Sequence, residues 1–173
     1  CQLLCSGKKV SNFLIHPSVR TTVHTKYQKM VLNTIHDIRK NFSSESVQQE
    51  LKNTYDRINP EKNPRCSFSD ICTKVHDLLI DDKIMNGKHE VPADEYESGV
   101  NILIGGNTLG RGVTFPSLHT ILYTRTSKHP QADTMWQHNR MFGYDRDPCL
   151  VELYIDQQLY KLFYDINATN NAM

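Results

Sequence analysis

The sequence lacks the features that mark a membrane-spanning or disulfide-stapled protein. None of its hydrophobic runs approaches about 18 residues, so no segment is expected to cross a membrane. The opening CQLLCSGKKV lacks the long apolar stretch of a signal peptide. The 5 cysteines are an odd number without the spacing of a zinc site, so we expect free thiols, a cytoplasmic location and no structural metal.

An excess of charge of one sign is also missing. The chain carries 20 Lys and Arg against 19 Asp and Glu, a formal net charge of +1, so an anionic partner would need a local basic patch. Its 173 residues suffice for one domain that buries about 70% of the surface of the unfolded chain. Because it starts on Cys1 and stops in a helical pattern without a clear terminator, we interpret it as a fragment of a larger protein.

The first half of the sequence predicts one strand followed by helices. Residues 10–16 (VSNFLIH) predict a strand that ends before a proline. Residues 20–80 carry three amphipathic helical patterns, the third opened by a capping box from Ser67 to Asp70. Residues 81–100 are polar and acidic, and we assign them to a surface connection with a short strand at 83–85.

The last third alternates strands and helices. Residues 101–106, 119–124 and 150–155 predict short strands, while residues 131–141 and the segment from about 157 predict helices. This alternation is typical of a three-layer α/β domain with a mainly parallel sheet. We therefore expect a single α/β domain over 1–173 with an inserted helical region.

A glycine-rich segment follows the strand at 101–106. The run ILIGGNTLGRGVTF brings bare backbone to the carboxyl edge of the sheet, where ligands of open α/β sheets bind. Gly110 and Gly112 flank Arg111, so the backbone can approach a ligand beside one cation; an ordinary glycine-rich turn is the alternative. The run matches neither GxGxxG nor GxxxxGK[ST], so no phosphate-cradling lysine is present in this segment.

A second segment, QADTMWQHNRMFGYDR at 131–146, ends a predicted helix with several polar side chains. Gln137 and Arg140 lie at the helix exit, and Arg146 follows a glycine. A guanidinium matches two phosphate oxygens at once, so these arginines suit a polyphosphate, although taken alone they would more often be surface ion-pair partners.

The two segments resemble motifs V and VI of superfamily 2 helicases, in the second RecA-like domain. More closely, ILIGGNTLGRGVTFPSL and TMWQHNRMFGYDR are similar to IIGGNxLSRGLTxxGL and TLMQMGRWFGYR of the Z1 domain family, and the resemblance covers nearly the whole chain. Z1 domains occur fused to helicase-like ATPase regions in bacterial restriction-type systems. Gly106 stands where many helicases carry a threonine, Asn139 replaces the glycine before the arginine, and Arg146 is one position later than in Z1 domains.

The resemblance implies half of a split ATP site. A first RecA-like domain would supply the Walker lysine and the Mg²⁺-binding carboxylates, so ATP and Mg²⁺ would be bound jointly with it, and DNA would be the other partner. Arg140, with Arg146, would act as an arginine finger. Residues for nucleotide binding and coupling would be Gly110, Arg111, Gly112, Thr114 and Gln137. Contacts to DNA phosphates would come from Ser18, Asn107, Thr108, Thr124 and Arg125.

Three functions stay open at this point. The first is the C-terminal RecA-like half of a DNA-dependent ATPase from a restriction or defence system. The second is an endonuclease domain that cuts DNA itself, although the acidic residues of 81–83 and 94–97 form no convincing metal-binding E-x-K or D-x-K element and are interpreted as solvated surface. The third is a non-catalytic interaction module, which would be favoured if Arg140 and Arg146 pointed away from the glycine-rich strand ends.

Overall fold

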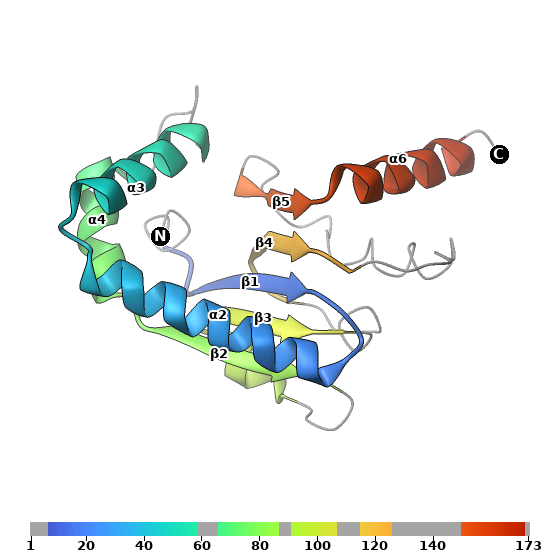
Figure 1. Ribbon diagram of the computed structural model, residues 1–173, viewed down its shortest axis with the longest axis horizontal. Coiled ribbons are helices and arrows are strands. Elements are labelled where there is room, and N and C mark those ends of the chain that lie inside the picture. Colours follow the sequence, from blue (N-terminus) through green and yellow to red (C-terminus); the bar gives the residue numbers. More distant parts are fainter. Residues whose placement is uncertain (1–6, 59–65, 87–90, 107–114, 126–149, 172–173) are drawn as a thin grey trace.

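The structure is a computed structural model that describes residues 7–58, 66–86, 91–106, 115–125 and 150–171 (Figure 1). Strands alternate with helices along the chain after an initial strand and a helical region. In chain order the elements are β1 (Val10–His16), α2 (Thr21–Lys40), α3 (Glu45–Ile58), α4 (Phe68–Asp77), β2 (Ile80–Met85), the 3-10 helix η1 (Ala93–Tyr96), β3 (Gly99–Gly105), β4 (Leu118–Tyr123), β5 (Glu152–Ile155) and α6 (Gln157–Asn171).

The five described strands form one sheet in the order β2-β3-β1-β4-β5, and every pairing is parallel. The sequences of β1, β3 and β4 are mostly apolar. This is expected for central strands of a parallel sheet, because both of its faces are covered. The α/β class and the parallel sheet predicted from the sequence are therefore confirmed. Parallel strands also bring all their carboxyl ends to the same edge.

Helices cover both faces of the sheet. On one face Tyr27, Val31 and Ile35 of α2 pack against a cluster centred on the isoleucines of β1 and β3. On the other face Leu159 and Phe163 of α6 pack against a second cluster that contains the buried leucines of the same strands. Alternate residues of each central strand thus belong to opposite cores, as the period of two in a strand requires.

A buried amide pair crosses the centre of the sheet. Asn101 Nδ2 donates to Asn12 Oδ1 at 2.9 Å, and Asn12 Nδ2 donates to the carbonyl oxygens of Tyr96 at 3.0 Å and Pro116 at 2.6 Å. These hydrogen bonds satisfy both polar atoms of the Asn12 amide, whereas Asn101 Oδ1 is buried without a partner among the described residues. The pair thereby attaches η1 and the residues before β4 to β1.

Helices α3 and α4 form an arm beside the amino ends of the strands (Figure 1). The predicted capping box is confirmed: Ser67 Oγ accepts from the backbone N–H of Asp70 at 3.1 Å, and Asp70 Oδ2 accepts from the backbone N–H of Ser67 at 3.2 Å. Arg57 of α3 reaches β5, where it pairs with Glu152 and donates to the hydroxyl of Tyr154 at 2.8 Å.

Two expectations from the sequence are wrong in part. Residues 81–100 are not only a surface connection: the short strand predicted at 83–85 is confirmed as the end of β2, which pairs with β3 from Ile80 to Met85, and the side chain of Tyr96 is in the core. The thiols are not all free, because Cys66 is disulfide-bonded, whereas Cys72 is free. The helix expected at 131–141 lies outside the described residues. None of the helices in the described ranges combines the length and apolarity needed to cross a bilayer.

Candidate functional site

The carboxyl ends of the three central strands meet at one edge of the sheet. The register aligns Ile15 of β1 with Ile104 of β3, and His16 with Tyr123 of β4. The residues that follow these strands therefore lie together at that edge. In open α/β sheets this is the edge at which ligands bind.

His16 connects the three strand ends. Its ring is completely buried, and its Nδ1 donates to the carbonyl oxygen of Gly105 at 2.9 Å. The backbone N–H of Thr124 donates to the carbonyl oxygen of His16 at 3.2 Å. Because its ring is completely buried, His16 is a packed histidine of the sheet.

Gly106 has no room for a side chain. A Cβ at this position would lie 2.7 Å from the carbonyl oxygen of Ser18 and 3.1 Å from the Cα of Val19. Both atoms belong to the backbone after β1, so they cannot rotate away. Glycine is therefore required at this position, since the chain after β1 occupies the space that a side chain would need.

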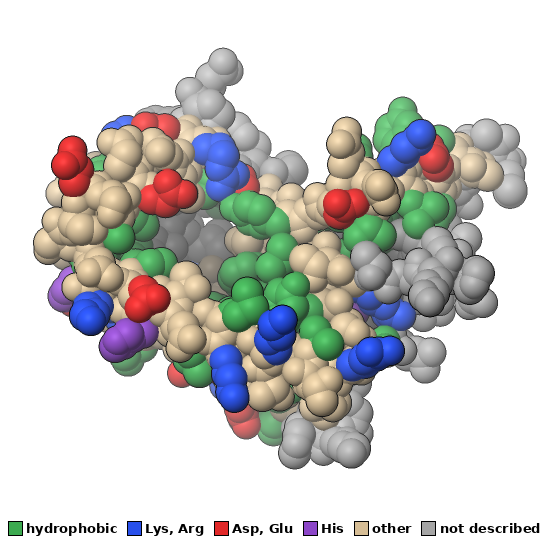
Figure 2. All heavy atoms as spheres, in the orientation of Figure 1, with side chains coloured by type: hydrophobic (Ala, Val, Ile, Leu, Met, Phe, Trp, Pro, Cys, Tyr) green, Lys and Arg blue, Asp and Glu red, His purple; other side chains and the backbone are tan. Residues whose placement is uncertain are grey.

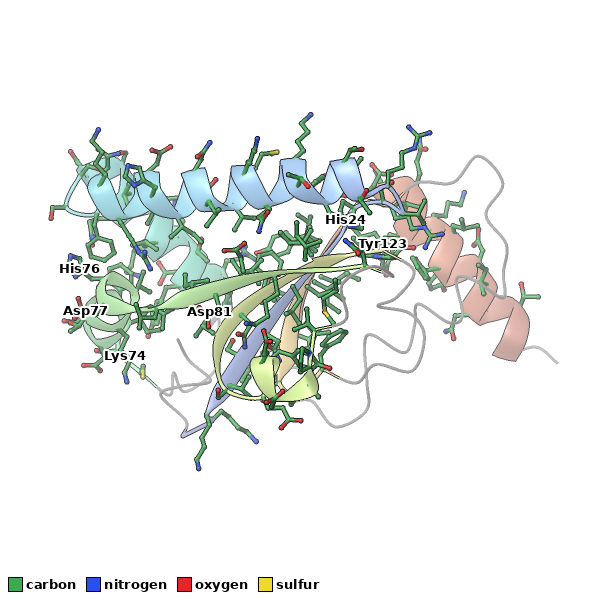
Figure 3. All side chains as sticks on the ribbon, turned by 90° about the horizontal axis from the view of Figure 1, so that it is seen from below. His24, Lys74, His76, Asp77, Asp81 and Tyr123 are labelled. Atoms are coloured by element: carbon green, nitrogen blue, oxygen red, sulfur yellow. The ribbon has the colours of Figure 1, made fainter. Side chains whose placement is uncertain are left out.

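Side chains from the first two turns of α2 form hydrogen bonds with the segments that follow β1 and β4 at this edge. His24 is 1% exposed, and its Nε2 donates to the carbonyl oxygen of Ser18 at 2.6 Å. The hydroxyl of Tyr27 and Thr124 Oγ1 are hydrogen-bonded at 3.1 Å. Figure 3 shows His24 and Tyr123 at the same end of the sheet, below the start of α2.

The described residues at this edge suit an anion. From Tyr123 to Arg125, from His16 to Arg20 and at Gly105 and Gly106 there is no carboxylate, while two arginines and three hydroxyl groups are present. Burial raises the pKa of Tyr123 to about 12, an effect that the positive charge of Arg125 partly offsets, so the phenol stays neutral at physiological pH. The edge therefore presents positive charge and hydroxyl groups together.

A family model described as Z1 domain matches residues 2–173. The chain belongs to the Z1 domain family. The resemblance noted in the glycine-rich and QHNR-containing segments is thus confirmed at the level of the family. Comparisons with curated proteins and with solved structures find no match.

The structure of this Z1 domain brings together only some of the predicted site residues. Ser18, Thr124 and Arg125 lie at the carboxyl edge, after β1 and β4. The remaining predicted residues lie outside the described residues, in the segments that follow β3 and β4 in sequence: Asn107, Thr108, Gly110, Arg111, Gly112, Thr114, Gln137, Arg140 and Arg146.

Sequence reasoning missed two side chains that shape this edge. Neither His24 nor Tyr27 is among the site residues predicted from the sequence, although each contacts one that is: His24 contacts Ser18, and Tyr27 contacts Thr124. Their spacing of three places them on one helix face, directly after the strand. Two polar side chains, His24 and Tyr27, in the first turns of the helix that follows a central strand could have indicated contacts at this edge.

The acidic segments of the Z1 domain make structural contacts. Asp82 Oδ2 accepts from Gln28 Nε2 at 2.6 Å, which ties β2 to α2, and Lys83 pairs with Glu95 at 3.3 Å. Across the part of the chain that the structure describes, no three side chains of His, Cys, Asp and Glu are grouped so that they could hold a metal ion.

Proposed function

We propose that this Z1 domain is the C-terminal RecA-like half of a DNA-dependent ATPase in a bacterial restriction or defence system. One observation carries the proposal. Strands β1, β3 and β4 end at one edge, and the glycine-rich segment and the QHNR-containing segment both continue the chain after β3 and β4. The candidate DNA contacts Ser18, Thr124 and Arg125 lie at the same edge.

The architecture supports this assignment. A five-stranded, all-parallel sheet with helices on both faces agrees with a RecA-like layout. RecA-like domains bind nucleotide at the carboxyl edge of such a sheet, which agrees with the general rule for open α/β folds. The hydroxyls and arginines there fit a phosphate, which is an anion.

The nucleotide would be shared between two domains. ATP and Mg²⁺ would be bound jointly with an N-terminal RecA-like domain of the parent protein, and ATP would supply the phosphoryl group. In this chain Gly110 and Gly112 allow close backbone approach, while Arg140 and Arg146 stabilise negative charge on the phosphates. The nucleotide-binding set is completed by Arg111, Thr114 and Gln137.

The track for DNA would run along the strand ends. Ser18 and Thr124, with Asn107 and Thr108, would donate hydrogen bonds to backbone phosphates, and Arg125 would add charge. Such contacts are independent of sequence and weaken with salt. Because His24 and Tyr27 hold the segments that carry Ser18 and Thr124, α2 would keep part of the track in place.

The decisive experiment measures ATP turnover by the full-length parent with and without double-stranded DNA, with this chain as a control. We expect DNA-stimulated turnover in the parent and none in the chain alone. In the parent, Arg140→Ala should lower turnover by about 10³-fold or more while nucleotide binding survives, because an arginine finger acts mainly on the transition state. Arg39→Ala, at the far end of α2, is the matched control and should leave turnover unchanged.

Two outcomes would contradict the proposal. Full turnover in the Arg140→Ala variant would remove the arginine-finger role. Absence of hydrolysis in the parent would remove the motor, and metal-dependent nicking of plasmid DNA by this chain would then favour the endonuclease function.

A further inference from the structure

One face of helix α2 carries a row of positive charge. Along its 20 residues, side chains three or four positions apart lie on the same face. One such row contains only exposed polar or cationic side chains, and we call it the outer face of α2: Thr22, Lys26, Lys29, Asn33, His36 and Lys40. It lies opposite Tyr27, Val31 and Ile35, which pack on the sheet.

Positive charge is concentrated on this helix. α2 contains four Lys and Arg residues and one carboxylate, Asp37, so its formal charge is +3, whereas that of the whole chain is +1 and the rest therefore sums to −2. From Thr21 to His36 the helix has no carboxylate. Figure 2 shows Lys and Arg side chains spaced along the region where Figure 1 places α2.

The protein does not neutralise these cations itself. None of Lys26, Lys29 and Lys40 forms an ion pair with any residue that the structure describes, whereas lysines elsewhere do, such as Lys52 and Lys83. Lys26 and Lys29 are three positions apart, so their charges repel each other and weaken the helix. An anion bound along the outer face would relieve this repulsion.

The start of α2 adds to the same charge. Acidic residues are stabilising in the first turn of a helix, because the N-terminus carries partial positive charge, but α2 has none there and Arg20 precedes it. Arg20 belongs to the segment after β1 at the carboxyl edge, where Arg125 also lies. The positive charge of that edge therefore continues onto the outer face.

The dimensions and composition of the outer face fit the phosphate backbone of a double helix. Lys26 and Lys40 are 14 residues apart. The row of cations is therefore about 21 Å long at about 1.5 Å a residue, which is within one turn of duplex DNA at about 34 Å. Asn33 and His36 add hydrogen-bonding groups between Lys29 and Lys40, and proteins contact DNA phosphates with both kinds of side chain.

A membrane and a single strand fit this face less well. A helix that lies on a membrane has a continuous apolar side, but the exposed apolar residues of α2, Met30 and Leu32, are two positions apart and so do not share a face. Proteins that hold single strands stack the bases on aromatic rings, and the outer face has no Phe, Tyr or Trp.

We propose that the outer face of α2 binds the phosphate backbone of double-stranded DNA, with Lys26, Lys29 and Lys40 each displacing a counterion from a phosphate. Such binding is independent of sequence and weakens with salt. The inference rests on the proposed function for DNA as the partner, but it does not depend on ATP turnover. It extends the surface for DNA from the strand ends along the helix that covers one face of the sheet.

The test measures binding of a fluorescent DNA duplex of about 20 base pairs, or two turns, to the 173-residue chain by anisotropy at several salt concentrations. The variant Lys26→Gln/Lys29→Gln/Lys40→Gln removes three charges, and α2 should remain folded because Gln and Lys have similar helix propensities. It should weaken binding at least about tenfold at low salt. The slope of log K against log salt should fall in magnitude by about 2 to 3, because each phosphate contact contributes about 0.9.

A control variant makes the same change in net charge at other exposed lysines. Lys8→Gln/Lys9→Gln/Lys74→Gln alters the segment before β1 and helix α4. It should weaken binding less than about twofold, because charges far from the DNA are screened by salt. Arg125→Gln separately tests the strand-end part of the DNA surface.

The outcomes separate this inference from the proposed function. Equal weakening by the two triple variants overturns the inference, and so does loss of binding in Arg125→Gln alone, which would leave the strand-end track in place. Absence of binding to the duplex overturns it, while ATP turnover by the parent still tests the motor. Binding to vesicles of equimolar phosphatidylserine and phosphatidylcholine, without binding to the duplex, also overturns it.

A further measurement covers a failure to fold, which circular dichroism detects. If the outer-face variant does not fold, the duplex is added to the unsubstituted chain and amide NMR shifts are followed. Shifts at Lys29 and Asn33 that exceed those at Lys74 support the inference, and their absence overturns it.

Discussion

At the scale of single residues, the carboxyl edge depends on side chains that act on backbone atoms. His24 Nε2 must carry a proton, because its partner, the carbonyl oxygen of Ser18, can only accept. His16 Nδ1 donates to Gly105 for the same reason. Each hydrogen bond fixes a tautomer and also fixes the chain just after a strand. Local sequence gives no indication of the second pair, since His16 and Gly105 are distant along the chain.

Replacement of Gly106 by alanine should be destabilising. The new Cβ would overlap the backbone at Ser18 and Val19, and overpacking of this kind typically costs about 1–3 kcal/mol. Urea denaturation measures the loss, and amide NMR shifts should change at Ser18 and His24. Gly99→Ala is the control, because nothing lies near its Cβ and its cost comes from a positive φ of 73°. Unchanged stability in Gly106→Ala would show that the chain after β1 can move.

The contact between Tyr27 and Thr124 should contribute about 0.5–1.5 kcal/mol to the free energy of unfolding. Tyr27→Phe removes the hydroxyl but keeps the ring that packs on the sheet. Thermal denaturation of this variant, of Thr124→Val and of the double variant isolates the pairwise energy. Tyr160→Phe, at a side chain that is 56% exposed, should have almost no effect. Strictly additive losses in the double variant would count against the hydrogen bond.

At the scale of elements, helix α4 shows how far local sequence suffices. Ser67 and Asp70 form their capping box within four residues, so the start of this helix was predictable. Strand β2 shows the opposite case. Its sequence, IDDKIM, is polar because it lies at the end of the strand order, and its identity depends on pairing with β3, which follows it across a connection.

The capping box should make the stability of α4 depend on pH. Hydrogen bonds from the side chain and backbone of Ser67 lower the pKa of Asp70 below its ordinary value of 3.8. The stabilisation is therefore complete above that value and is lost as the pH falls through the lower pKa of the folded state. Asp70→Asn should be less stable than the unsubstituted chain at pH 7, and the difference should shrink below about pH 4. Asp94→Asn, at an exposed residue of η1, is the control. A difference that does not change with pH would contradict this role.

At the scale of the whole molecule, burial is concentrated in the sheet. Each of β1, β3 and β4 has completely buried side chains, such as Leu14, Leu103 and Leu118, whereas no side chain of α3 or α4 is buried. The arm is joined to β5 by Arg57, in contacts that are largely exposed and therefore weak. The two parts should consequently differ in local stability.

Hydrogen exchange should resolve this difference. Amides of α3 and α4 should exchange at least about tenfold faster than those of β1 and β3, because regions with little buried apolar surface open locally at lower cost. Mass spectrometry of peptides from 45–58 and from 99–105 gives the comparison. Equal protection in the two peptides would mean that the arm opens only when the sheet unfolds.

The sequence by itself determined the elements whose signals are local. The strand at 10–16, the capped helix after Ser67, the strands of the last third and the Z1 motifs could all be recognised within short windows, because periodicity and capping act over a few residues. Only the tertiary structure decided the strand order, the membership of β2 in the sheet and the meeting of Ser18, Gly106 and Thr124. These features arise from contacts between distant parts of the chain, whose geometry no local pattern specifies.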